Sequence, residues 1–146
     1  MNKLYKISIT RRFVIDAGHR IVGHEGKCLS VHGHCYVFFV TCEAPELDSI
    51  GRIIDFSVIK DRIGKWLDEN WDHAMLLYVN DPIILLWNES GPLEEHKHFV
   101  LPYNPTIENL CSFLLEKTNA LMAATEIKVV KVVGYETENC AGSAEL

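Results

Sequence analysis

The sequence feature that most constrains this chain is the triplet His32-Gly33-His34, which opens a run rich in aromatic and β-branched residues. Such a run is typical of a β-strand, in which residues two positions apart point to the same face. Both imidazoles would then face one side and could share one metal ion. Gly33 between them leaves the opposite side without bulk. The triplet therefore predicts a strand that carries a metal site at its start.

A candidate third ligand lies at the end of the preceding strand. Residues 4–19 alternate between apolar and polar side chains, and the apolar parity continues to His19. The segment 22–30 contains glycines and several polar residues and is interpreted as a loop. A long antiparallel hairpin of residues 4–19 and 32–43 would bring His19 to the same place as the triplet.

This set of ligands favours a catalytic metal. Three neutral imidazoles leave a fourth coordination position for water or substrate, as in catalytic rather than structural zinc sites. Zinc is favoured by ligand type and availability, although cobalt, nickel or iron could use the same ligands in vitro. The spacing alone is weak evidence, because many such pairs are incidental. His96 and His98 have the same spacing around a lysine in a polar segment and are interpreted as surface residues, and His24 as a loop residue.

The middle of the chain changes from strand to helix periodicity. Apolar residues recur on one helical face from Phe56 to Leu67, and Asp55 or Ser57 is expected to cap the start of this helix. Residues 71–104 are less regular. They contain a short helical segment at about 82–89 and a loop rich in proline, glycine and histidine.

The last third of the chain predicts a second long helix and two strands. Thr106 is expected to cap a helix that runs to about Ala124, and strands follow at 127–137 and in the tail at 139–146. The order is β-β-α-α-β-β in a single domain of residues 1–146. This order predicts an α+β fold, with two helices on one face of an antiparallel four-stranded sheet.

The strand at 32–43 is apolar on both faces. Val37 and Phe39 point to one side, and Phe38 and Val40 point to the other. Helices can cover only one of these faces, so the other face is expected to be buried against another subunit. We therefore expect an oligomer.

Charge and cysteine content exclude several classes of protein. A net charge of −6 argues against a general nucleic-acid binder, which favours a basic face. The first residues lack the apolar region of a signal peptide, and no apolar run is long enough to cross a bilayer. The 5 cysteines are odd in number and contain no C-x-x-C pair, which fits free thiols in a reducing cytosol. We expect a cytoplasmic protein without a nucleic-acid or membrane partner.

Cys28 is a candidate catalytic thiol. It precedes the triplet in the loop, next to Lys27, and a nearby metal ion and this cation would favour the thiolate form. A thiolate can act as a base or a nucleophile. The alternative is that Cys28 is a small buried apolar residue, which is how Cys35, Cys42 and Cys111 are interpreted.

Asp72, His73 and Glu136 are further polar candidates. A histidine oriented by a carboxylate can transfer protons near neutral pH, but adjacent residues seldom pair, so Asp72 could instead support the helix end. Glu136 lies in an otherwise apolar strand, where a buried carboxylate needs a partner. A heterocycle edge with two adjacent N–H donors would suit Glu136. The alternative is that the strand already enters solvent there.

Six motifs in a fixed order resemble the family of the 6-pyruvoyltetrahydropterin and 6-carboxytetrahydropterin synthases. The similar segments cover nearly the whole chain, and six ordered motifs are far more specific than any one of them. They are Phe13–Arg20 (F-x-A-x-H-R), Cys28–His34 (C-x₃-H-G-H), Ile54–Lys60 (D-F-x-x-L-K), Trp71–His73 (L-D-H, with Trp for Leu), Pro105–Asn109 (P-T-x-E-N) and Glu136–Thr137 (E-T).

The resemblance implies a T-fold (tunnelling fold), in which sheets from several subunits join into a barrel with active sites at subunit interfaces. It suggests a homohexamer, a dimer of trimers. It also implies 7,8-dihydroneopterin triphosphate as the substrate. By position, His19, His32 and His34 are expected to hold zinc, which would acidify C–H bonds beside the substrate hydroxyls that it binds.

The resemblance also implies roles for the polar candidates. Cys28 is expected to remove a side-chain proton of the substrate. Asp72 and His73 are expected to be its relay partners, with His73 as the second acid or base.

Substrate binding is assigned in the same way. Glu136 is expected to anchor the amino-pyrimidine edge of the pterin, and Thr106 and Glu108 are weaker candidates near that pocket. Lys27 and Arg20 are assigned to the triphosphate on charge alone.

Within the family, the spacing of four residues from Cys28 to the triplet resembles the bacterial 6-carboxytetrahydropterin synthases of queuosine biosynthesis. The expected products are 6-carboxy-5,6,7,8-tetrahydropterin, acetaldehyde and triphosphate. The alternatives are a triphosphate-eliminating 6-pyruvoyltetrahydropterin synthase, or a non-catalytic zinc-binding protein with this fold. Three features depart from the family pattern, namely a longer segment at 81–98, a short last strand, and Gly18 where alanine is more usual.

Overall fold

The computed structural model describes residues 4–90 and 95–146. Its strands form one six-stranded sheet in the order β4-β3-β1-β2-β5-β6. The strands are β1 (Ile9–His19), β2 (His32–Glu43), β3 (Met75–Tyr78), β4 (His98–Leu101), β5 (Lys128–Thr137) and β6 (Cys140–Glu145). The helical elements are η1 (Lys27–Leu29), α1 (Phe56–Ile59), η2 (Lys60–Gly64), α2 (Lys65–Asn70), α3 (Ile83–Ser90) and α4 (Ile107–Leu121).

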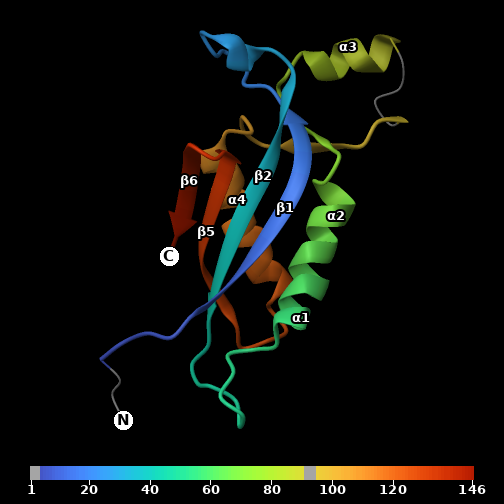
Figure 1. Cartoon of the computed structure of the whole chain (residues 1–146). Helices are drawn as coiled ribbons and strands as arrows, with labels where there is room; N and C mark the ends of the chain where they lie inside the picture. Colours follow the sequence, from blue (N-terminus) through green and yellow to red (C-terminus); the bar gives the residue numbers. More distant parts are fainter. Residues whose placement is uncertain (1–3, 91–94) are drawn as a thin grey trace.

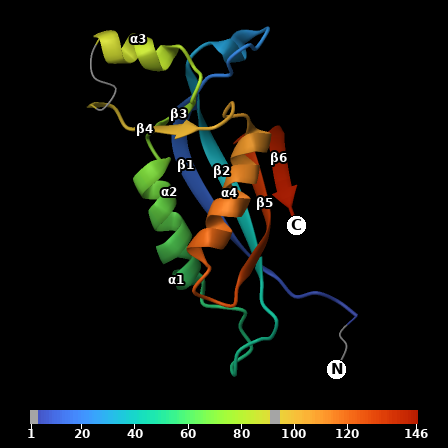
Figure 2. The same cartoon turned by 180° about the vertical axis from the view of Figure 1, so that it is seen from behind.

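Two long helical segments cover one face of the sheet. Figures 1 and 2 show α4 and the continuous rod of α1, η2 and α2 side by side on this face, while α3 lies apart, near the end of the sheet that carries β3 and β4. The predicted α+β class and the placement of two long helices on one face are confirmed.

The prediction of a four-stranded antiparallel sheet is wrong. β1, β2, β5 and β6 are antiparallel neighbours as expected, but β3 and β4 add two short strands that pair parallel to β1 and to each other. Each added strand has four residues, which is too short for a periodic pattern. Parallel strands also lack the hairpin turn that would mark them in the sequence.

The hairpin of β1 and β2 is confirmed, but β1 is shorter than predicted. Its first residue, Ile9, pairs with Cys42, and β2 ends one residue later at Glu43. Residues 4–8 therefore have no strand beside them to accept their backbone hydrogen bonds, although their side chains alternate as in a strand. At the other end, His19 pairs directly with His32.

Side chains cap both long helices. The Asp55 carboxylate accepts a hydrogen bond from the backbone N–H of Ser57, and the Thr106 hydroxyl accepts one from Asn109. Both caps satisfy N–H groups that have no partner within the helix. A π-helical turn, Lys60–Gly64, interrupts the first rod without ending it.

The core lies between the helices and the inner face of the sheet. Tyr36, Phe38 and Val40 of β2 are fully buried there, together with Trp71. Gly134 of β5 allows the close approach of α4, because a Cβ at this position would lie within 3 Å of three side-chain atoms. Replacing Trp71 by alanine is expected to cost about 3–5 kcal/mol, from lost burial and the cavity left behind.

No helix of the described residues covers the outer face of the sheet (Figures 1 and 2). Cys35 is exposed and Val14 is 45% exposed, whereas Val37 and Phe39 are half-buried. No helix in the described ranges 4–90 and 95–146 has the length and apolar character that crossing a membrane requires.

Candidate metal centre and active site

His19, His32 and His34 meet at one end of the β1–β2 hairpin, on the helix-covered face. His19 pairs with His32, and Ala17 pairs with His34, so the strand register sets the three side chains next to one another. One ligand atom from each imidazole lies within 4.8 Å of the others. The predicted cluster of three histidines is therefore present in the folded chain.

Backbone carbonyls fix the orientation of two of these rings. Nδ1 of His19 lies 2.8 Å from the carbonyl oxygen of Pro105, and Nδ1 of His32 lies 2.7 Å from that of Ser30. A carbonyl only accepts hydrogen bonds, so each Nδ1 carries the proton and each Nε2 keeps its lone pair. Hydrogen bonds of this kind orient histidine ligands in metal sites.

The donor set fits a metal ion such as zinc. With both Nδ1 atoms protonated, the Nε2 atoms of His19 and His32 face each other as two lone pairs only 3.0 Å apart. Two acceptors at this distance repel each other unless a cation lies between them. A tetrahedral ion with Zn–N bonds of about 2.0–2.1 Å would hold its nitrogens roughly 3.3 Å apart, which is close to the observed separation.

Burial keeps these rings in the form that binds metals. Desolvation lowers the pKa of His19 to about 4, opposed by the hydrogen bond to Pro105 and reinforced by the neighbouring histidines. Burial also lowers the pKa of His34, while Glu136 raises it. Both rings are therefore neutral near pH 7, as a metal ligand must be.

Tyr36 forms the floor of the cluster and was not identified from the sequence. Its ring contacts those of His19 and His34, with centroids 5.7 and 5.4 Å apart, and it is fully buried. Its hydroxyl has no hydrogen-bond partner among the described residues. Burial, and then Glu136, raise the pKa of Tyr36, so the hydroxyl keeps its proton.

Glu136 lies against the cluster. It is on the inner face of β5 near the end of the strand, and its Oε1 lies 3.9 Å from Nε2 of His19. Its side chain is 23% exposed, so the carboxylate is open to solvent on one side. A cation held by the three imidazoles would have this carboxylate as a close neighbour.

Cys28 lies in η1, in the loop that joins β1 to β2, and it is half-buried. The loop folds back on itself, because the N–H of Ile21 donates to the carbonyl of Cys28 at 2.9 Å. Lys27 beside it is exposed. Figure 1 shows this loop beyond the ends of β1 and β2 that carry the histidines.

Asp72 and His73 form a pair that covers the edge of β1 beside Asp16, whose carbonyl accepts a hydrogen bond from the N–H of His73 at 2.6 Å. The Asp72 carboxylate accepts hydrogen bonds from the backbone N–H of Asp16 at 2.9 Å and from Nδ1 of His73 at 3.0 Å. Adjacent residues seldom pair, but these do, because His73 has a positive φ of 61° that turns its ring back toward Asp72. Partial burial raises the pKa of Asp72, but these hydrogen bonds outweigh it and lower the pKa overall.

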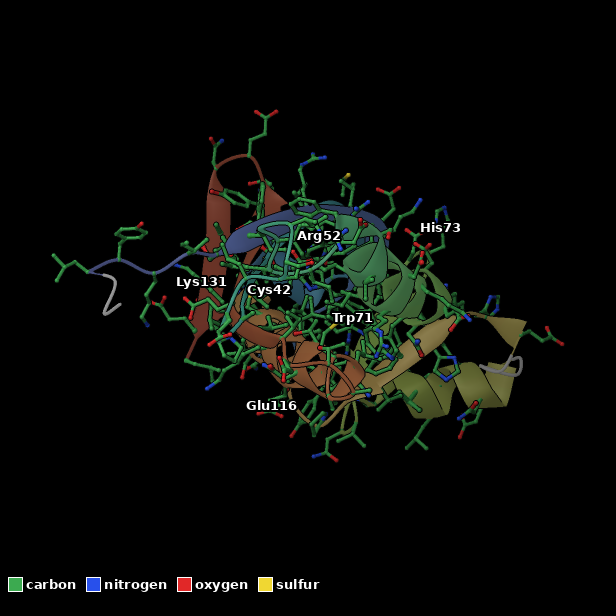
Figure 3. The ribbon with its side chains drawn as sticks, turned by 90° about the horizontal axis from the view of Figure 1, so that it is seen from below. Cys42, Arg52, Trp71, His73, Glu116 and Lys131 are labelled. Atoms are coloured by element: carbon green, nitrogen blue, oxygen red, sulfur yellow. The ribbon has the colours of Figure 1, made fainter. Side chains whose placement is uncertain are left out.

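His73 faces away from the interior of the chain. Its side chain is 76% exposed, and Figure 3 shows it at the rim of the molecule, whereas Trp71 lies inside. His73 lines a shallow hollow together with Asp16 and Cys35, and residues 32–34 of the histidine triplet also line it. In the described part of the chain, neither Cys28 nor Glu136 lines this hollow. Within the described part of one chain, His73 therefore shares this hollow with residues of the triplet but not with Cys28.

The remaining candidates for substrate binding differ in whether their polar groups already have partners within the chain. The Thr106 hydroxyl caps α4, and Glu108 is exposed in the first turn of that helix. Arg20 makes two hydrogen bonds to the buried carboxylate of Asp81, at 2.7 and 2.8 Å. This pairing occupies its guanidinium and leaves Lys27 as the better candidate for an anionic group.

Sequence reasoning missed the groups that orient the site. The carbonyls of Pro105 and Ser30 act through the backbone, so no side-chain type marks them. Asp81 could have been identified as a helix cap, because aspartate is common just before a helix. Its carboxylate accepts a hydrogen bond from the N–H of Ile83.

Comparison with known proteins places this geometry in context. The family model "6-pyruvoyl tetrahydropterin synthase" matches residues 8–145. A "6-carboxy-5,6,7,8-tetrahydropterin synthase" of Rickettsia felis is 39% identical over 139 residues, which cover 92% of this chain and 96% of that protein. An uncharacterized protein from Wolinella succinogenes has a similar structure, with a TM-score of 0.82, 22% identity and coverage of 97% and 98% of the two chains. The Caenorhabditis elegans 6-pyruvoyl tetrahydropterin synthase superimposes with a TM-score of 0.68 at 21% identity, covering 100% and 99%.

Proposed function

The chain belongs to the 6-pyruvoyl tetrahydropterin synthase family, and from this premise we propose that it makes 6-carboxy-5,6,7,8-tetrahydropterin. The substrate is 7,8-dihydroneopterin triphosphate, which takes up water and releases acetaldehyde and triphosphate. The observation that carries the proposal is the near full-length similarity to relatives named for this activity. The product would enter queuosine biosynthesis in the cytoplasm.

Zinc is the proposed cofactor, held by His19, His32 and His34. The arrangement of three neutral imidazoles, two of them oriented by carbonyls, supports this choice. Bound zinc would supply Lewis acidity to the substrate's side-chain hydroxyls, so that neighbouring C–H bonds lose protons more readily.

Cys28 is the proposed base that takes a proton from the substrate side chain. Zinc binding by three histidines does not need this thiol, so its position four residues before His32 supports a catalytic role. The Asp72 carboxylate holds His73 through Nδ1, which leaves Nε2 of His73 available to give or accept a proton.

The proposed site is shared between copies of the chain. Asp72 and His73 lie at the edge of β1, at a hollow that the thiol loop does not line. Along most of its length β1 pairs only with β2, since β3 pairs with Gly18 and His19 alone. This free edge and the uncovered outer face support assembly into a barrel, and a homohexamer built as a dimer of trimers. A neighbouring copy would then bring its Asp72 and His73 to Cys28.

Glu136 is the proposed anchor of the pterin. Its two carboxylate oxygens match the adjacent N–H donors of an amino-pyrimidine edge. Thr106 and Glu108 are proposed to line this pocket, and Lys27 to meet the triphosphate.

The decisive experiment is an assay of products. Zinc-loaded protein is incubated with 7,8-dihydroneopterin triphosphate, and the products are identified by mass spectrometry. We expect 6-carboxytetrahydropterin and acetaldehyde from the wild type and from Cys140→Ala, which removes another exposed thiol. Cys28→Ala should be inactive while it retains zinc.

Other products would change the assignment in defined ways. A 6-pyruvoyl product would keep the site but change the reaction to triphosphate elimination. Absence of turnover by folded, zinc-loaded wild type would contradict the proposed activity and favour a zinc-binding protein without catalysis. Full activity of Cys28→Ala would contradict the role of the thiol.

A further inference from the structure

We propose that Asn104 is a positioning residue that holds the loop carrying Cys28 in register with the metal cluster. The inference rests on the proposed function only in giving Cys28 its catalytic role. Asn104 precedes Pro105, whose carbonyl orients His19. One dipeptide would thus set the positions of both a metal ligand and the thiol.

The side chain of Asn104 pairs with the backbone of Val22 as a neighbouring strand would. Its Oδ1 accepts from the N–H of Val22 at 2.9 Å, and its Nδ2 donates to the carbonyl of Val22 at 3.0 Å. The two residues are 82 positions apart, so this contact joins distant parts of the chain. Asn104 is half-buried, which limits competition from water.

This contact is the tie between the loop and the rest of the molecule. Among the described residues, the other hydrogen bonds of loop residues 22–31 stay within residues 21–32. They include the bond from Ile21 to the carbonyl of Cys28, at 2.9 Å. Because Ile21 adjoins Val22, a displacement of Val22 passes directly to Cys28.

Asn104 is itself held by the first turn of α4. Its carbonyl accepts hydrogen bonds from Nδ2 of Asn109 and from the N–H of Thr106, each at 2.9 Å. The contact with His19 uses the carbonyl of Pro105, which does not depend on the Asn104 side chain. The geometry therefore separates two functions, one carried by the backbone and one by the side chain.

Removal of the Asn104 side chain should displace the thiol and spare the metal. A misplacement of about 1 Å can lower a rate by roughly 100-fold, and we expect kcat of Asn104→Ala to fall between about tenfold and 100-fold. Zinc content should fall little, because His19 keeps its hydrogen bond to Pro105, although the Ser30 carbonyl that orients His32 lies in the displaced loop. KM should change less than kcat, because Glu136 is not moved, although Lys27 lies in that loop. Asn104→Asp keeps the acceptor for the N–H of Val22 but places a carboxylate oxygen against the carbonyl of Val22, and these two acceptors repel each other. Its kcat should therefore fall at least as far as that of Asn104→Ala.

The experiment compares wild type, Asn104→Ala, Asn104→Asp and Asn80→Ala. Asn80 is a matched control, since its amide is exposed and, among the described residues, bonds only to the Tyr78 hydroxyl two positions away. Zinc content, kcat, KM and amide hydrogen exchange are measured for each. We expect faster exchange at residues 21–31 in both Asn104 variants, with β1 and β2 unchanged, and no effect in the control.

Three outcomes would overturn the proposal. The first is amide hydrogen exchange in the loop at the wild-type rate. The second is an unchanged kcat despite faster exchange. The third is a loss of zinc and stability in both Asn104 variants that parallels their loss of activity. If the wild type does not turn over dihydroneopterin triphosphate, the proposed function fails. Amide hydrogen exchange and zinc content then still decide whether the Asn104 side chain fixes the loop without affecting metal binding.

Discussion

The chain contains two histidine pairs with identical spacing, and they lie in contrasting surroundings. In His32-Gly33-His34, the imidazoles turn toward the covered face of the sheet and meet His19, with carbonyls behind two of the rings. The glycine between them fits the close contact with β1, since a Cβ there would lie 3.1 Å from the carbonyl oxygen of Ala17.

In His96-Lys97-His98, the histidines do not form a cluster with a third ligand in the described ranges 4–90 and 95–146. Nδ1 of His98 hydrogen-bonds the carbonyl of His96 instead. Lys97 donates to the carbonyls of Asp68 and Asp72. In each pair one ring is oriented by the carbonyl two residues before it. The spacing therefore only permits a metal site, and the third imidazole, His19, distinguishes the first pair.

The largest expected effect is on metal content. His32→Ala should lose zinc by at least roughly 100-fold in affinity, because a ligand is removed and the lone pair of His19 is left without a shared cation. His96→Ala should bind zinc as the wild type does. Metal analysis after dialysis against a weak chelator measures both, and equal zinc loss in the two variants would break the comparison.

The next effect is on the pH dependence of stability in metal-free protein. Burial lowers the pKa of His19 from 6.5 to about 4, so between these values the unfolded chain binds the proton more readily than the folded chain. The contribution of His19 to the free energy of unfolding is therefore fully present above pH 6.5. As the pH falls from 6.5 to 4, this contribution decreases by about 3 kcal/mol. The free energy of unfolding, measured by urea titration at several pH values, should fall more steeply with decreasing pH in the wild type than in His19→Gln. Equal pH dependence in the two proteins would contradict the assignment.

A smaller effect should follow from filling the space at Gly33. In Gly33→Ala the new Cβ meets backbone at 3.1 Å, which cannot move away as a flexible side chain would. We expect a destabilisation of about 1–3 kcal/mol, as for other overpacked sites, and weaker zinc binding because β1 and β2 separate. Denaturant titration checks this, and wild-type stability would mean that the close approach does not matter.

The smallest effect concerns Lys97, at the centre of the other pair. Lys97→Met should leave zinc content unchanged and lower kcat roughly threefold to tenfold, because the turn that holds Asp72 and His73 loses two hydrogen bonds to a charged donor. Lys65→Met is a matched control, since Lys65 is 70% exposed and its one ion pair within the described ranges is with Glu69. Equal kcat values for Lys97→Met and Lys65→Met would show that Lys97 does not support the Asp72–His73 pair.

Much of the fold could be predicted because apolar residues recur at regular spacing along its long strands and helices. The hairpin of β1 and β2, both long helices and the cap at Thr106 follow from alternation, helical spacing and capping residues. For the first helix the sequence left Asp55 or Ser57 as the cap, and the structure has Asp55. β3 and β4 could not be predicted, since four-residue parallel strands have no turn signal and only tertiary pairing defines them.

The cluster of three histidines was predictable from the sequence, and its surroundings were less so. The register of β1 and β2 brings His19 to His32 once the hairpin is recognised. The contact of Glu136 with the cluster and the pairing of Arg20 with Asp81 depend on how distant segments pack, which residue spacing does not encode. The Asp72–His73 pair needed a positive φ that no residue type at that position announces.

The most direct test of the account is X-ray absorption spectroscopy at the zinc edge of the purified protein. The central claim is that His19, His32 and His34 bind the metal, while Cys28 stays free to move a proton. We predict a first shell of nitrogen and oxygen at about 2.0–2.1 Å, with imidazole scattering and no sulfur. A sulfur shell at about 2.3 Å, lost in Cys28→Ala, would make the thiol a ligand and contradict its role as the base.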